Sequence, residues 1–167
     1  VSTLGHELGH ALHSYFSTKN QSFVNSRYPI FLAEVASTVN EALLMDYVLK
    51  QTVDREQKIS LLGQYLEEFR GTLFRQTQFA EFELRIHELV ETGGSQTGEK
   101  FSQIYLDILK KYYGHDEKIC IIDDLYGIEW AYIPHFYYNF YVFQYSTSFT
   151  AAQAVASRIL NGDQEII

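Results

Sequence analysis

Residues 2–17 read Ser-Thr-Leu-Gly-His-Glu-Leu-Gly-His-Ala-Leu-His-Ser-Tyr-Phe-Ser. Apolar side chains recur in this stretch at the three- and four-residue spacing of one helix face, at Leu4, Leu8, Ala11, Leu12, Tyr15 and Phe16. The spacing predicts a helix over residues 2–17. On such a helix, side chains four positions apart lie one turn apart on the same face.

Helical patterns continue through the rest of the chain. Asp54 is an expected N-cap for a long helix that ends at the Gly93-Gly94 pair, and Thr97 opens the next helix. The helices are expected over residues 32–51, 54–92, 97–113 and 135–160, with a polar loop at 19–30 and irregular structure at 115–133. Because no run of alternating strands is found, the sequence predicts an all-α fold.

The length and the two ends of the chain set the expected domain organisation. The chain has 167 residues, of which 46% are hydrophobic, which suits one globular domain and is too short for two ordinary ones. A chemical motif begins at residue 6, and the chain stops shortly after an expected helix end. We therefore expect a fragment truncated at both ends, with a single partial domain over residues 1–167.

Charge and composition exclude several classes of partner. With 13 basic and 21 acidic residues the formal net charge is −8, which disfavours nucleic acid and anionic membrane surfaces as partners. No apolar run approaches the roughly 20 residues of a membrane-spanning helix. Cys120 is the only cysteine and can form no internal disulfide, so we expect a reducing cytoplasm.

The pair His6 and His10 indicates a metal site. On a helix the two imidazoles share a face and can hold one ion, while Glu7 follows the first of them. This is the His-Glu-x-x-His pattern of zinc peptidases, in which the glutamate is the general base. The five-residue pattern also occurs by chance, and the donor types alone leave cobalt and manganese open beside zinc.

A catalytic zinc ion requires a third protein ligand. His13 lies about 10.5 Å along the helix from His6, too far to share its metal, and is expected to pack or line a pocket. Glu34 stands among small and apolar neighbours, where an unpaired carboxylate is costly and a metal would compensate. Glu41, two turns later, is a candidate partner that orients a ligand histidine, although both acids could also be solvated helix residues.

These residues resemble a known family. The chain is similar to the oligoendopeptidase F branch of the thimet oligopeptidase family in three stretches. These are the run from His6 to His13, the run Ala-Glu-Val-Ala-Ser-Thr-Val-Asn-Glu that contains Glu34 and Glu41, and the run from Ile133 to Tyr145. The resemblance implies a helical, two-lobed zinc metallopeptidase that cleaves short peptides in a deep channel. It implies His6, His10 and Glu34 as zinc ligands and Glu7 as base, in a catalytic lobe that lacks its N-terminal partner lobe and last helices.

The aromatic stretch near the C-terminus supplies further candidates. In a helix over 135–160, Tyr138, Tyr141 and Tyr145 would share one face, with His135 one turn before Tyr138. A phenol or an imidazole there could stabilise the oxyanion of a tetrahedral intermediate, and the family resemblance implies that His135 and nearby tyrosines contact substrate. Aromatic stripes are also common in helix cores, and Tyr137 is a further candidate.

Three functional hypotheses remain open from the sequence. The first is a zinc endopeptidase for short oligopeptides, and the second is a carboxypeptidase that uses the same motif. The third is an inactive helical module, because a site cut from its surroundings can lose the arrangement of its ligands. Apolar surface exposed by truncation would favour self-association. His87 and His115 are expected at the surface.

Overall fold

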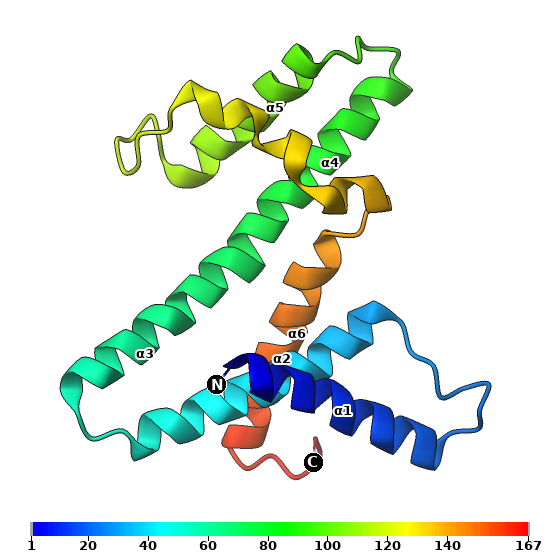
Figure 1. Cartoon of the computed structure of the whole chain (residues 1–167), viewed down its shortest axis with the longest axis vertical. Coiled ribbons are helices and arrows are strands. Elements are labelled where there is room, and N and C mark those ends of the chain that lie inside the picture. Colours follow the sequence, from blue (N-terminus) through cyan, green and yellow to red (C-terminus); the bar gives the residue numbers. More distant parts are fainter. Residues whose placement is uncertain (1, 167) are drawn as a thin grey trace. The chain divides into compact units, whose positions relative to one another are not determined.

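The computed structural model describes residues 2–166, and every regular element within that range is a helix. The all-α prediction is therefore confirmed. The chain divides into two compact units, which we call unit 1 (Val1–Leu73 with Gln144–Ile167) and unit 2 (Phe74–Phe143). Figure 1 shows the chain coloured from its N-terminus to its C-terminus.

Most helix boundaries agree with the sequence. The elements are α1 (Ser2–Asn20), α2 (Ile30–Gln51), α3 (Arg55–Glu68), the π-helical η1 (Phe69–Phe74), α4 (Arg75–Glu91), α5 (Gly98–Tyr113), the 3-10 helices η2 (Asp124–Tyr132) and η3 (Pro134–Tyr138), and α6 (Phe143–Leu160). Asp54 caps α3 by accepting from the backbone N–H of Gln57 at 2.8 Å. Thr97 caps α5 by accepting from the backbone N–H of Lys100 at 3.2 Å. Both caps were predicted.

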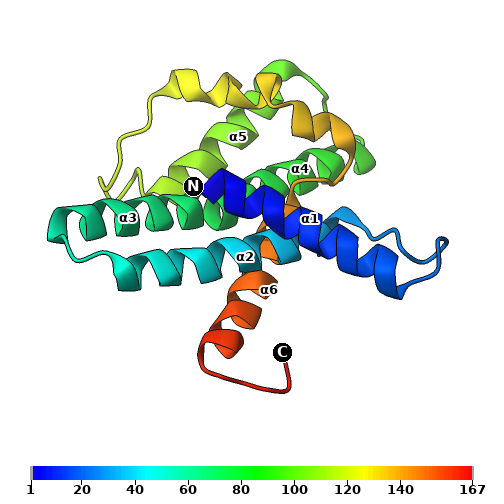
Figure 2. The same ribbon diagram turned by 60° about the horizontal axis from the view of Figure 1, so that its bottom comes forward.

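Unit 1 is built on the crossing of α1 and α2, which form the most extensive contact between two elements. Figures 1 and 2 both show α1 lying across α2. A β-carbon at Gly9 would lie 2.6 Å from the Cα of Ser37, so the two backbones meet where α1 has no side chain. Beside this point, the Asn40 amide donates to the carbonyl of Gly5 at 2.6 Å. The glycine and this hydrogen bond fix how α1 lies on α2.

The apolar stripe of α1 is not the face that is buried. Leu4, Leu8, Leu12, Tyr15 and Phe16 are all at least half exposed, whereas Gly5 and Gly9 are buried. The helix was predicted correctly, but its small residues make the contact. Within residues 2–166 no helix is long and apolar enough to cross a membrane. Self-association through the exposed apolar side chains stays a prediction.

Unit 2 has its own hydrophobic core. Its buried members come from α4, α5 and the segments that follow α5: Phe79, Phe82, Tyr105, Leu106, Ile108, Leu109, Ile122, Ile133 and Val142. Glu129 of η2 pairs with Arg75 of α4 and accepts from the hydroxyl of Tyr105 at 2.6 Å. The pairing gives the partly buried carboxylate of Glu129 a countercharge, and it ties η2 to both helices.

The single helix predicted over residues 135–160 is wrong. Residues 134–138 form the short η3, and α6 begins only at Phe143. Between them, Asn139 and Phe140 have φ of 48° and 54°, in the left-handed region that interrupts a right-handed helix. Tyr138, Tyr141 and Tyr145 therefore do not share a helix face. Neither residue is a glycine, so nothing in the sequence marks this reversal.

Two histidines expected at the surface are partly buried instead. The centroid of the His87 ring lies 4.4 Å from the centroid of the Phe140 ring. The Nδ1 of His115 accepts from the backbone N–H of Ile122 at 2.9 Å. Both histidines thus hold neighbouring segments of unit 2, a role that helical spacing does not reveal.

The close approach at Gly9 generates a stability prediction. Gly9→Ala places a methyl group against the backbone of α2, and we expect it to lower the free energy of unfolding by about 1–3 kcal/mol. Gly63→Ala is the matched control, because nothing lies within 4 Å of its added β-carbon in α3. This control should be neutral or stabilising by up to about 1 kcal/mol. Denaturant unfolding of both variants checks the prediction, and equal stability of the two would contradict it.

Candidate metal centre

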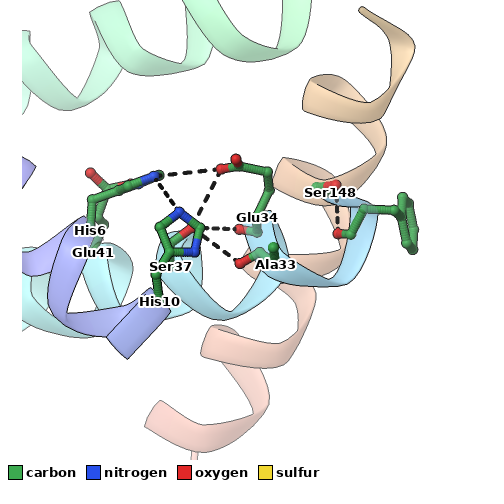
Figure 3. A network of polar contacts seen from close by, with 8 residues as sticks. His6, His10, Ala33, Glu34, Ser37, Glu41 and Ser148 are labelled. Atoms are coloured by element: carbon green, nitrogen blue, oxygen red, sulfur yellow. Dashed lines mark hydrogen bonds and ion pairs between the residues drawn. The ribbon is translucent and has the colours of Figure 1, made fainter. Parts of the chain in front are cut away.

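Three side chains from α1 and α2 converge on one point. The Nε2 atom of His10 lies 3.1 Å from Nε2 of His6, which lies 3.5 Å from Oε2 of Glu34. One ligand atom from each residue lies within 4.8 Å of the other two. Figure 3 shows the two imidazoles and the carboxylate turned toward one another. Each of the three residues is partly buried.

Local structure explains this convergence. His6 and His10 are one turn apart on α1, and Glu34 lies in the second turn of α2. The glycine between the two histidines lets α1 approach α2, so the carboxylate can reach both rings. The fully buried hydroxyl of Ser37 lies 3.1 Å from the carbonyl oxygen and 3.4 Å from Oε2 of Glu34. Ser37 thus supports the carboxylate from within α2.

The carboxylate of Glu41 lies behind the ring of His6. Its Oε2 lies 3.2 Å from the Nδ1 of His6. In the tautomer with the proton on Nδ1, the ring donates to this carboxylate and turns the lone pair of Nε2 toward the cluster. A carboxylate behind the imidazole is the usual partner of a metal-ligating histidine, because it fixes the ring and its tautomer.

The cluster fits a zinc ion by donor type and spacing. Two imidazoles and one carboxylate leave a fourth position open, as catalytic zinc sites do. Ligand atoms about 2.0–2.1 Å from a tetrahedral ion lie roughly 3.3–3.4 Å apart. The separations of 3.1 and 3.5 Å bracket that spacing. The ligand atoms of His10 and Glu34 lie within 4.8 Å of each other, so all three residues are close enough to share one ion.

A cavity of about 420 Å³ opens beside the cluster. Its lining residues in unit 1 are His6, Glu34, Thr38, Glu41, Glu68, Thr72, Tyr145 and Phe149. Tyr145, a sequence candidate, thus lines the same cavity as two of the clustered residues. Glu7 is exposed on α1, next in sequence to His6.

Glu68 and Thr72 were missed by sequence reasoning. They lie one turn apart, at the end of α3 and in the π-helical η1. Burial raises the pKa of Glu68, and the neighbouring charge of Glu41 raises it further. Nothing in the sequence marks which face of the long helix is turned to α2, so no signal identified these two residues.

His13 stands apart from the cluster. Its ring stacks on that of Tyr28 with centroids 3.9 Å apart. Its Nδ1 is buried and has no hydrogen-bond partner among the described residues. Burial, and then the nearby His10, lower its pKa. These contacts describe a packing histidine.

The other aromatic candidates lie in unit 2, where they form a group that we call the aromatic cluster: His135, Tyr138 and Tyr141. The ring of His135 stacks on that of Tyr141, with centroids 5.9 Å apart. The ring of Tyr138 lies 5.8 Å from that of Tyr141 and 6.1 Å from that of His135. The reversal at Asn139 and Phe140, rather than a helix face, brings the three rings together. Tyr137 is exposed.

Comparisons with known proteins give matches over nearly the whole chain. Residues 1–166 match the model of peptidase family M3. Oligopeptidase PepF of Bacillus subtilis is 51% identical over 95% of this chain and 23% of its own length. The chromosomal oligoendopeptidase F of Lactococcus lactis subsp. cremoris is 49% identical over 96% of this chain and 26% of its own length.

A solved structure supports the same assignment. The crystal structure of oligoendopeptidase-F from Enterococcus faecium has a TM-score of 0.83 and 46% identity to this chain. The match covers 99% of this chain and 29% of that one. The chain thus spans about a quarter of the length of the curated relatives it matches. From its sequence and its fold, the chain belongs to peptidase family M3.

Proposed function

We propose that this chain carries the metal centre of a zinc-dependent endopeptidase that hydrolyses short peptides. The convergence of His6, His10 and Glu34, with Glu41 behind His6, is the observation that carries the proposal. The relatives' names, oligopeptidase and oligoendopeptidase, favour oligopeptides as the substrate class. Because the chain spans about a quarter of those relatives, the activity belongs to a longer protein of which these residues form part of the catalytic lobe.

His6, His10 and Glu34 would hold the ion, and Glu41 would keep the His6 ring in place. A bound zinc ion supplies Lewis acidity, which lowers the pKa of a water and polarises a peptide carbonyl. Glu7 accepts the proton of the attacking water and delivers a proton to the leaving amine. Its position at the surface of α1 leaves its carboxylate free of the packing against α2.

Aromatic side chains contribute hydrogen bonds to the substrate. Tyr145 lines the cavity next to His6 and Glu34, which makes it the first candidate to donate to the developing oxyanion. His135, Tyr138 and Tyr141 contribute further donors for peptide carbonyls. The net charge of −8 favours neutral or cationic peptides. The absence of a second cysteine suits a reducing cytoplasm.

Glu7→Gln separates catalysis from metal binding. In the full-length protein, we expect this variant to keep its zinc and to lose at least about 100-fold in kcat, because the amide cannot act as a base. Glu34→Ala is the matched variant, and we expect it to lose zinc as well as activity. Elemental analysis and cleavage of a fluorogenic peptide provide the two measurements.

Normal turnover by Glu7→Gln would rule out Glu7 as the base, and full zinc content in Glu34→Ala would rule out Glu34 as a ligand. The same elemental analysis of the 167-residue chain alone decides whether the isolated helices bind zinc. A chain without zinc would support the alternative that it is inactive in isolation.

Endopeptidase and carboxypeptidase action are distinguished by blocked substrates. We expect the full-length protein to cleave an internally quenched peptide whose two ends are both blocked, because an endopeptidase needs neither terminus. A free C-terminal carboxylate should alter the rate only modestly. Cleavage that requires a free C-terminus would instead assign the carboxypeptidase alternative.

A further inference from the structure

Glu83 is a buried acid that the proposed chemistry does not use. It lies in α4 of unit 2 and is 2% exposed. Its Oε1 accepts the backbone N–H of Phe140 at 2.5 Å, across 57 positions of sequence. Other acids of the same helix, Glu88 and Glu91, are exposed. A buried carboxyl group is costly unless it is hydrogen-bonded, and the hydrogen bond from Phe140 offsets this cost for Glu83. The position of this acid beside Phe140 therefore suggests a role for it.

The electrostatics of Glu83 fit an anchoring role. Burial raises its pKa, whereas the hydrogen bond from Phe140 and the nearby His87 lower it. His87 lies one turn after Glu83 on α4, and its ring contacts that of Phe140 with centroids 4.4 Å apart. The two α4 side chains therefore hold one residue in two ways, Glu83 by its backbone and His87 by its ring.

The anchored residue lies within the reversal that ends η3. Asn139 and Phe140 both have positive φ, which residues with side chains seldom adopt. The hydrogen bond from the Phe140 amide to Glu83 favours this backbone shape over the helix that the flanking sequence would otherwise form. The reversal turns the chain so that Tyr138 and Tyr141, on either side of it, have ring centroids 5.8 Å apart.

We propose that Glu83, assisted by His87, is a positioning residue that holds Phe140 in this reversal and so assembles the aromatic cluster for substrate binding. Its contribution to turnover rests on the proposed peptidase function, whereas its anchoring of Phe140 does not. Its effect passes through the backbone between Tyr138 and Tyr141.

Three variants of the full-length protein test the proposal by kinetics. Glu83→Ala removes the acceptor, and we expect kcat/KM for a fluorogenic peptide to fall at least about 30-fold with zinc content unchanged, because misplaced substrate groups are costly. Glu83→Gln keeps an acceptor oxygen, so it should stay within about threefold of the wild type. Glu88→Ala, an exposed acid on α4, is the control and should leave kcat/KM unchanged.

Hydrogen exchange provides the structural readout. In Glu83→Ala we expect faster amide exchange in peptides that cover residues 134–143, with α5 protected as in the wild type. If Glu83→Ala instead accelerates exchange throughout unit 2 and leaves KM and kcat of the folded fraction unaltered, the substitution only lowers stability. That result would overturn the proposal. His87→Ala, which keeps the carboxylate, should show the same local change with a smaller kinetic loss, and it replaces Glu83→Ala if that variant does not fold.

The two proposals fail in different ways. If the wild type cleaves no peptide, the proposed function is wrong, while exchange over residues 134–143 still tests the anchor. If the wild type is active and Glu83→Ala matches Glu88→Ala in both kcat/KM and exchange, the anchor is wrong and the proposed function stands. Loss of activity in Glu83→Gln equal to that in Glu83→Ala would also contradict the hydrogen-bond role.

Discussion

The contact of α1 with α2 at Gly9 is the constraint on which the candidate metal centre depends. Two imidazoles on one helix can meet a carboxylate on another only if the helix axes come close, and here a β-carbon at position 9 would lie 2.6 Å from the Cα of Ser37. The Asn40 amide then fixes the register through the Gly5 carbonyl. Small residues, and not the apolar stripe of α1, set the geometry of the site.

Electrostatics around His6 follow from that geometry. Glu34 and Glu41 face its two ring nitrogens, and Glu68 lines the same cavity. Burial raises the pKa of Glu68, and the nearby charge of Glu41 raises it further. A divalent cation would offset this repulsion. The arrangement is therefore one that a bound metal ion would stabilise.

In unit 2, a backbone turn rather than a helix contact places the aromatic side chains. No helix face holds the aromatic cluster together, since η3 ends at Tyr138 and α6 begins at Phe143. The turn between them has an unfavourable backbone shape that Glu83 and His87 hold from α4. Here a buried carboxyl group supports a local conformation by accepting a hydrogen bond from the backbone.

The sequence by itself determined the all-α class, most helix boundaries, the Asp54 and Thr97 caps and the family, because these depend on local spacing and short motifs. It also selected His6, His10, Glu34 and Glu41, since one-turn spacing and an acid among apolar neighbours are local signals. Only the tertiary structure decided that Glu68 and Thr72 line the cavity and that Asn139 and Phe140 break the last helix. Those features depend on which helix faces meet and on a hydrogen bond between residues 57 positions apart, which no periodicity along the chain encodes.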